Sequence, residues 1–515
     1  MMLKSILFSA GIIILVMVVF TFCRSESSIR DSLSDDLNHV LDIAELRREN
    51  LYHPDYEHLL RLASLRNPPA NARNVFNYID WDRHDYRLYG ISLLGANHDV
   101  ETFFSALQTS YGLYTYLGGD EIFLPIRNAI LEIVNTQEVP NPPTRTTWST
   151  HALEDLLVTK LRPVINDGHF TIGRERFLMD YIFFTADARF RLNENGFYNI
   201  INGAYVESLE LPCIPELYFK LDTTFRLSMC ANGAEFFYVP VIYLREQAGM
   251  VYPRFMTITY TNEIYETFEI LEVIQPERPE HQPPSLEIVQ GIPVLTIMAM
   301  GAIANPNGFA YEEGRQVMAY VNELRDKPIF IIDLRGNFGG TGSLPLNWFY
   351  ELLNQNVPST YVSLLAICID VQRNFFRGPT HDAAIINRFR PSRMFDDNHR
   401  YVNYPPRNIV QNNQLIIILV DRHSASAAEW MTDLAFNITN TLVIGQNTAG
   451  VALSGFTSWS FILPHSRIKF NFGSSLTVHT DGHFREGLGY APDIWVEGDA
   501  LAAALAMLDN HVLMD

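Results

Sequence analysis

The chain has 515 residues, of which 47% are hydrophobic, 12% aromatic and 19% charged, and its formal net charge is −20. At roughly 150 residues per domain this length predicts about three domains, and the apolar content excludes a disordered chain. With 58 acidic against 38 basic residues and no basic tract, nucleic acid is not expected as a partner. The four cysteines form no CxxC pair, which excludes a structural zinc site and a disulfide-rich scaffold. Whether Cys213 and Cys230 form a disulfide in an oxidising compartment is left open by the sequence.

The N-terminus has the features of an exported protein. A single lysine at position 4 precedes a nearly continuous apolar run over residues 6–22, which suits a signal peptide or a short membrane span. Cys23 follows directly, where a bacterial lipoprotein carries its acylated cysteine, although Phe22 stands where lipoprotein signals have a small residue. We therefore expect residues 1–23 to be a signal peptide or a membrane anchor, and the anchor could be either an uncleaved helix or a lipid attached to Cys23. The protein would then lie in the cell envelope, on its periplasmic or extracellular side.

The rest of the chain divides into a helical part, a β-rich part and an α/β part. Apolar residues at three- and four-residue spacing predict an N-terminal helical domain over 35–165. The alternating pattern of 170–274 predicts a β-rich segment, for which a PDZ-like fold is one candidate, and the proline-rich stretch 275–287 predicts a linker. From 288 to 515, buried strands alternate with helices, as in a mixed, largely parallel α/β sheet. Residues 372–411 interrupt this alternation and predict a long excursion.

A serine-containing turn follows one of these strands. The segment 421–429, DRHSASAAE, comes directly after the strand QLIIILV and begins a helix. Small neighbours and the free N–H groups of a helix N-terminus suit a nucleophilic serine and an oxyanion hole. Taken by itself, the segment fits an ordinary helix N-cap at Ser424 or Ser426 better.

Two further turns carry candidate functional residues. In the segment 332–342, IDLRGNFGGTG, Gly339 and Gly340 could turn N–H groups towards an anion, or could only make a tight connection. The spacing matches neither of the usual phosphate-binding loops, so a nucleotide is not expected. In NDGHF, residues 166–170, His169 could act as a general base near neutral pH, or could be an ordinary histidine on a turn after a helix.

Five motifs in this order resemble those of the C-terminal processing or tail-specific serine peptidases, in the broad sense that includes the tricorn core. They are DGH, DLRGNFGG, DRHSASAAE, VIGQNTAG and EGLGYAPDI. The likeness covers about residues 288–510, and the DGH turn with the following YNIINGAYVESLE extends it more weakly to the N-terminal half. It implies a ClpP/crotonase-like core and a serine endopeptidase that acts on peptides or proteins. It implies no metal or organic cofactor. The number of chains that assemble stays open.

The resemblance also implies roles for individual residues. Ser426 is the matched nucleophile, and the N–H of Ala427 with that of Gly339 or Gly340 would form the oxyanion hole. The better-known branch of the family places a lysine base after the serine, but this chain has Val451 at that spacing (451 − 426 = 25). A Ser–Lys dyad is therefore not expected. The other branch uses histidine with a glutamate behind it, which implies His169 as the base and Glu486 as the supporting carboxylate.

Three alternatives stay open beside this interpretation. His423, three residues before Ser426, is a rival base, and Glu486 could instead pair with Arg485 or another surface arginine. The chain could also be a catalytically inactive module on the same fold that binds a peptide or lipid. Finally, the chain could be a factor that confers resistance to inhibitors or antimicrobial peptides by clearing a limited class of peptides at the membrane surface. A narrow tunnel over Ser426 would favour this alternative, and the acidic net charge could attract cationic peptides.

Overall fold

The computed structural model describes residues 29–49, 90–136, 147–214, 217, 219–246, 252–358, 361–365, 409–455, 460–473, 475–479 and 484–513. The predicted anchor at 1–23 and nearly all of the predicted excursion at 372–411 lie outside the described residues. Within the described residues, none of the helices combines the length and the apolar character that a membrane span needs.

A six-stranded sheet forms the centre of the C-terminal half. Its first two strands are antiparallel, and every later pair is parallel. The strands are, in spatial order, β14 (Ser285–Val289), β15 (Ile292–Thr296), β16 (Ile329–Asp333), β18 (Leu415–Val420), β19 (Thr441–Gly445) and β24 (Ile494–Trp495). Every residue of β16, β18 and β19 is buried, because helices cover both faces of the sheet. The predicted mixed, largely parallel α/β sheet is confirmed.

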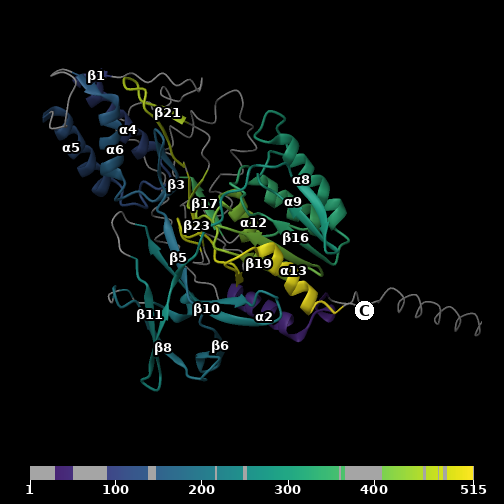
Figure 1. Ribbon diagram of the computed structural model, residues 1–515. Helices are drawn as coiled ribbons and strands as arrows, with labels where there is room; N and C mark the ends of the chain where they lie inside the picture. The colour runs from purple at the N-terminus through teal and green to yellow at the C-terminus, as the bar shows by residue number, and fades with distance from the viewer. Residues whose placement is uncertain are drawn as a thin grey trace, which may run out of the picture.

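Helices cover the two faces of this sheet in two layers (Figure 1). One face packs against α8 (Tyr311–Leu324), α9 (Ser343–Leu353) and α12 (Ala427–Ala435), and the other against α13 (Ala500–His511) and α2 (Asp35–Glu49). On α2, Leu37, Leu41 and Ala44 join the same buried cluster as Leu442 of β19. The first helix of the predicted domain 35–165 therefore packs under the central sheet and not with the helices that follow it.

The later N-terminal helices pack around an aromatic core with a distant hairpin. Phe103 lies 4.9 Å from Phe470, measured between ring centroids. These elements are α4 (Leu93–Ser110), α5 (Asp120–Thr136), α6 (Thr150–Leu161), the paired short strands β1 (Gly90–Ser92) and β2 (Thr147–Ser149), and the hairpin β21 (Ser460–Ile462)–β22 (Lys469–Asn471). The hairpin continues through β3 (Asp167–Ile172) to β4 (Glu175–Phe177) as one four-stranded sheet. Strand β3 is thereby fixed between the N-terminal helices and the C-terminal half.

The segment after β4 is β-rich, as its alternating pattern predicts, and lies below α4, α5 and α6 in Figure 1. One sheet contains β5 (Tyr181–Thr185), β6 (Phe190–Asn193), β7 (Gly196–Asn199), β9 (Phe225–Met229), β10 (Phe236–Arg245) and β13 (Leu271–Glu272). A second contains β8 (Val206–Glu210), β11 (Phe255–Tyr260) and β12 (Tyr265–Glu269), and a third, near the central sheet, contains β17 (Tyr361–Leu365), β20 (Ser454–Gly455) and β23 (Ser475–His479). Cys213 and Cys230 are both free thiols.

Candidate active site

The turn between β18 and α12 holds Ser426 in an unusual backbone conformation. Its φ is 53° and its ψ is −112°, whereas an ordinary N-cap serine has an extended backbone. For a residue with a Cβ, such a conformation is strained and persists only where the surroundings enforce it. Ser424, in contrast, is fully buried and donates its hydroxyl hydrogen bond to Leu334 O at 2.8 Å. The structure thus separates a partly buried, strained Ser426 that lines a cavity from a fully buried, structural Ser424.

A buried carboxylate fixes the start of this helix. Glu429 accepts hydrogen bonds from the N–H of Ser426 at 2.9 Å and from the N–H groups of Gly450 and Val451 at 2.8 Å. It also accepts one from the Thr448 hydroxyl at 2.7 Å. Burial raises the pKa of Glu429, while these hydrogen bonds lower it. Glu429 therefore ties the turn that carries Ser426 to the loop that follows β19.

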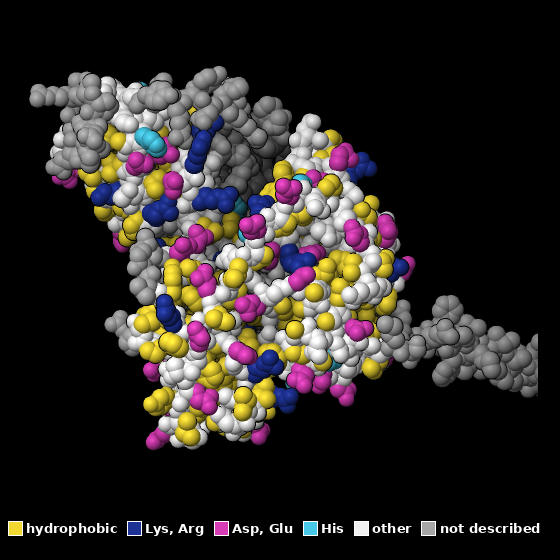
Figure 2. Space-filling model, in the orientation of Figure 1, with side chains coloured by type: hydrophobic (Ala, Val, Ile, Leu, Met, Phe, Trp, Pro, Cys, Tyr) yellow, Lys and Arg dark blue, Asp and Glu magenta, His cyan; other side chains and the backbone are white. Residues whose placement is uncertain are grey.

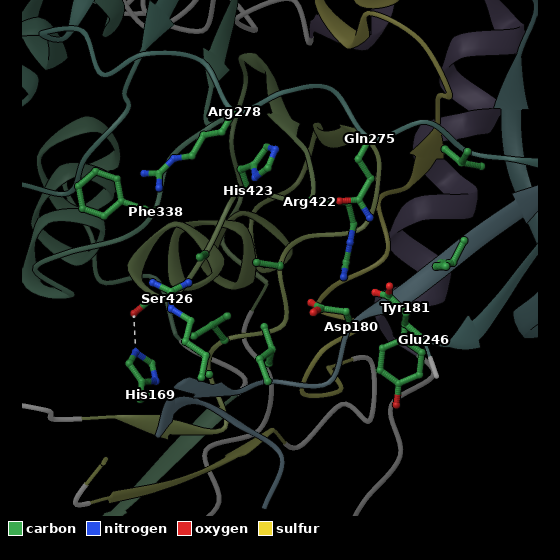
Figure 3. A pocket seen from close by; sticks show the side chains of 18 of the residues that line it. His169, Asp180, Tyr181, Glu246, Gln275, Arg278, Phe338, Arg422, His423 and Ser426 are labelled. Carbon is green, nitrogen blue, oxygen red and sulfur yellow. Dashed lines mark hydrogen bonds between the residues drawn. The ribbon is translucent and has the colours of Figure 1, made fainter. Parts of the chain in front are cut away.

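His169 comes from the other half of the chain and faces Ser426. Its Nε2 lies 3.4 Å from Ser426 Oγ (Figure 3). Its Nδ1 lies 3.4 Å from Ser454 Oγ. The residue sits within strand β3, and not on the turn that the sequence predicts. Burial lowers the pKa of His169 from 6.5, the neighbouring Asp167 opposes this effect, and Arg176 adds to it. The structure therefore brings together the two residues predicted to react.

The rival base points elsewhere. His423 Nε2 lies 2.9 Å from the carbonyl oxygen of Pro276, in the segment predicted as a linker. Because a carbonyl only accepts hydrogen bonds, this nitrogen is the donor and is not available as a base. Among the described residues, His423 makes no hydrogen bond to Ser426, so the geometry favours His169.

Glu486 lies near His169 but does not contact its ring. Its carboxylate accepts hydrogen bonds from the N–H groups of Gly168 and Leu453 at 2.8 Å and of Ala452 at 3.2 Å. Burial first, and then the charge of Asp167, raise the pKa of Glu486 well above its ordinary value. In the described part of the chain Glu486 pairs with no arginine, and the Arg485 guanidinium donates to the hydroxyl of Tyr243 at 3.3 Å. Glu486 holds the backbone on either side of the site.

Sequence reasoning missed the group that does contact the far side of the imidazole. Ser454 donates its hydroxyl hydrogen bond to Asp167 Oδ1 at 2.6 Å, and Tyr111 donates to Asp167 Oδ2 at 3.0 Å. Each of the three side chains is at most 1% exposed. Asp167 stands in the quoted DGH motif, two residues before His169, so the motif itself held a signal. Ser454 belongs to no motif.

The two candidate glycines differ in how their N–H groups are used. Gly339 donates to Asn337 Oδ1 at 2.8 Å, which occupies its N–H. In the part of the chain that the structure describes, no acceptor is found for the N–H of Gly340 or Ala427. A Cβ at Gly339 would lie 2.7 Å from both Ser426 Cβ and Ala425 O, so glycine is required there for close approach. Of the two, Gly340 is the better match to the predicted oxyanion donor.

An open cavity of about 910 Å³ lies over Ser426 and His169 (Figure 3). Its walls come from several parts of the chain: Arg176 and Asp180 near β4, Arg278 in the predicted linker, and Phe338 after β16. Arg278 stacks on Phe338 with its guanidinium carbon 4.8 Å from the ring centroid. Such a volume accommodates several side chains of an extended peptide.

One group of side chains could hold a metal ion, away from this cavity. His98, Asp99 and His465 place one donor atom each within 4.8 Å of one another. The carboxylate of Asp99 already accepts from the N–H groups of His465 and Ser466, at 3.0 and 2.6 Å. This group lies outside the residues that line the cavity, and its contacts fasten the β21–β22 turn to α4.

Comparison with known proteins identifies the central domain. The model of peptidase family S41 matches residues 294–496, a range that includes Ser426 and Glu486 but not His169. No curated protein sequence matches the chain. Among solved structures, mature CPAF is 14% identical with a TM-score of 0.38, covering 81% of this chain and 96% of that chain. The photosystem II D1 C-terminal processing protease is 10% identical with a TM-score of 0.36, covering 82% and 98%.

The tricorn protease is 11% identical with a TM-score of 0.32, covering 80% of this chain and 37% of that chain. Identities and TM-scores this low carry over no residue's role and no substrate. The matched range, by contrast, contains the DLRGNFGG, DRHSASAAE, VIGQNTAG and EGLGYAPDI motifs in their expected order. Residues 294–496 are therefore identified as a peptidase family S41 region.

Proposed function

We propose that the chain is a serine endopeptidase that cleaves peptide or protein substrates outside the cytoplasm through an acyl-enzyme. Ser426 Oγ attacks the scissile carbonyl while His169 Nε2 takes its proton and then returns it to the leaving amine. Water hydrolyses the acyl-enzyme with His169 again as base. The observation that carries this proposal is the 3.4 Å approach of Ser426 Oγ to His169 Nε2 from positions 257 residues apart.

The N–H groups of Gly340 and Ala427 would stabilise the oxyanion of the tetrahedral intermediate. Both residues lie next to the reacting pair: Gly340 lines the same cavity, and Ala427 directly follows Ser426. Donors that the backbone holds in place need no reorganisation when charge develops, and each contributes on the order of 10²–10³-fold in rate. The proposed core for this chemistry is of the ClpP/crotonase type, with the nucleophile at the carboxyl end of a parallel strand.

Glu486 enters the proposal as a support for the site and not as the carboxylate against the ring. It fixes the N–H of Gly168, next to His169, and those of Ala452 and Leu453, next to Ser454. By holding both strands, it keeps the imidazole aligned with Ser426.

We further propose that the enzyme is tethered to the cell envelope by residues 1–23 and acts on the periplasmic or extracellular side. The support is the apolar run 6–22 followed by the polar, charged stretch RSESSIRDSLSDD. Acidic and basic side chains are interspersed over the face seen in Figure 2, which fits substrates that are peptides and not nucleic acid.

Labelling with a fluorophosphonate probe, which reacts with activated serines, tests the proposed chemistry on the purified full-length chain. Wild type is expected to label, whereas Ser426→Ala and His169→Ala are expected to lose labelling. His423→Ala is the matched control and keeps it. A wild type that does not label would favour the inactive binding module. Labelling that persists in Ser426→Ala would exclude Ser426 as the nucleophile.

A further inference from the structure

We infer that Ser454 and Asp167 are positioning residues that hold His169 in the tautomer with its proton on Nδ1. This assignment rests on the proposed Ser426–His169 pair and deepens it. It places a serine hydroxyl, and not a carboxylate, directly behind the catalytic imidazole. The supporting charge then acts one hydrogen bond further away, from Asp167.

The direction of the Ser454 hydroxyl follows from its partners. Its Oγ lies 2.6 Å from Asp167 Oδ1, a distance typical of a charge-assisted hydrogen bond. An ionised carboxylate only accepts, so the hydroxyl proton points at Asp167. The lone pairs of Ser454 Oγ are left for His169 Nδ1, 3.4 Å away.

This direction fixes the proton on the imidazole. To meet a lone pair on Ser454, His169 must carry its proton on Nδ1. A neutral imidazole has one N–H, so Nε2 then presents its lone pair to Ser426 Oγ. That is the form in which His169 can act as a base. The two 3.4 Å distances are those of a site without substrate and are expected to tighten in the complex.

Asp167 is itself held on both oxygens. Oδ1 also accepts from the N–H of His169 at 2.9 Å, and Oδ2 accepts from the hydroxyl of Tyr111 at 3.0 Å. Asp167 and Tyr111 are fully buried, and Ser454 is 1% exposed. A carboxylate fixed in this way cannot rotate away from the serine, so the chain from Asp167 through Ser454 to His169 is pre-organised.

Glu486 does not compete for this role, because its two oxygens are occupied by backbone N–H groups of Gly168, Ala452 and Leu453. Asp167 raises the pKa of His169 and thus favours the imidazolium that forms when Ser426 loses its proton. The titratable and charged groups around His169 and its cavity are Tyr111, Asp167, Arg176, Asp180, Tyr181, Glu246, Glu272, Arg278, Arg422, His423, Glu429 and Glu486.

The test compares rates of fluorophosphonate labelling across pH for the full-length wild type, Ser454→Ala and Asp167→Asn. Ser454→Ala removes the hydroxyl that accepts from Nδ1–H but keeps the backbone hydrogen bond of Ser454 to His169, and is expected to slow labelling on the order of 10-fold. Asp167→Asn should slow it at least as much, because an amide N–H can donate to Ser454 and turn its hydroxyl towards Nδ1. The imidazole proton would then move to Nε2, the wrong position.

A second effect of Asp167→Asn separates positioning from a purely structural role. Without the negative charge, the pKa of His169 falls, so the acid limb of the pH profile is expected to move to lower pH. Damage to packing would lower the amount of active protein without moving this limb. Ser475→Ala is the matched control: Ser475 is 2% exposed on the neighbouring strand β23 and makes no hydrogen bond to His169 or Asp167. It should keep the wild-type rate and profile.

The ¹⁵N shifts of the His169 ring, assigned by their loss in His169→Ala, give a readout that does not depend on activity. We expect the Nδ1–H form in wild type and the Nε2–H form in Asp167→Asn. Wild-type rates with an unmoved acid limb in both variants would overturn the relay while leaving the Ser426–His169 pair intact. A wild type that does not label would overturn that pair instead. If Asp167→Asn does not fold, Ser454→Ala decides by its rate and its ring shifts.

Discussion

Single residues at this site hold conformations that their surroundings enforce. Ser426 has a positive φ of 53°, which costs a residue with a Cβ about 1–3 kcal/mol. Glu429 binds its N–H, and Gly339 leaves room for its Cβ. The strain is thus maintained by identifiable contacts, and it presents Oγ to the cavity.

The first prediction concerns Gly339. In Gly339→Ala, the new methyl group would lie 2.7 Å from Ser426 Cβ and Ala425 O, and φ is +94°. The turn must shift, so we expect fluorophosphonate labelling to fall by about 10-fold or more. Gly498→Ala is the control, because a Cβ there has no atom within 4 Å. Equal labelling of the two variants would contradict the close approach of the two turns.

The second prediction concerns pH. His169 must be neutral to act as a base, and burial lowers its pKa from 6.5. Labelling should therefore rise with pH along an acid limb whose midpoint lies below 6.5, and should be fully developed at neutral pH. Rates measured between about pH 4.5 and 8 give this midpoint. A midpoint above 6.5 would mean that Asp167 outweighs burial.

At the residue scale, the sequence predicted the two side chains that the structure brings together, but not the groups behind His169. The small-residue turn and the DGH motif indicated Ser426 and His169, since both follow from local pattern and family resemblance. Glu486 was assigned to the imidazole, whereas its carboxylate binds three backbone N–H groups. Ser454 could not be foreseen, because its contact with His169 spans 285 positions and depends on how two sheets meet.

Among the elements, two buried carboxylates fasten the loop after β19 from opposite sides. Glu429 accepts from the N–H groups of Gly450 and Val451, and Glu486 accepts from those of Ala452 and Leu453. Four consecutive N–H groups are thus satisfied by side chains instead of by a strand partner. This loop leads into β20, which carries Ser454, so its path sets the position of the serine behind His169.

The third prediction concerns Glu486. Glu486→Ala leaves one buried and two partly buried N–H groups without an acceptor, and a buried one costs about 1–3 kcal/mol, so a clear fall in Tm is expected, together with slower labelling. Glu486→Gln keeps one acceptor oxygen, so its Tm should fall less than that of Glu486→Ala. Unchanged Tm in Glu486→Ala would show that the carboxylate does not hold these strands.

The pH dependence of Tm in wild type and in Glu486→Gln gives a further check. The raised pKa of Glu486 means that the folded state takes up a proton more readily than the unfolded state. The resulting stability is fully present below the unfolded pKa of about 4.5 and is lost as pH rises through the folded pKa. Wild type should therefore lose Tm relative to Glu486→Gln as pH increases. A constant difference would contradict the raised pKa.

Element types were more predictable than element partners. Alternation and buried runs located the strands of the central sheet and the β-rich segment. The helical spacing of α2 identified an apolar face but could not show what this face packs against. In the structure it packs under β19, whereas α4 belongs to a different cluster. His169 was placed on a turn because it follows a helix, yet pairing with β4 and β22 draws it into a strand.

Across the whole molecule, the site depends on distant segments coming together. The S41 match spans 294–496 and contains Ser426, whereas His169 is supplied by β3, which pairs with the β21–β22 hairpin of the C-terminal half. Residues 168–182 and 272–278 complete the cavity wall. Composition and charge excluded nucleic acid as a partner and indicated several domains, but neither can place one segment against another.

The most direct measurement for the central claim is the mass of the proteolytic peptide that carries the probe after fluorophosphonate labelling of the full-length protein. Ser424 and Ser426 lie in the same peptide, so fragmentation must locate the adduct. The Ser426–His169 mechanism predicts one adduct, on Ser426, that disappears in His169→Ala. An adduct on Ser424 or on any other residue, or an adduct on Ser426 that forms as fast without His169, would contradict it.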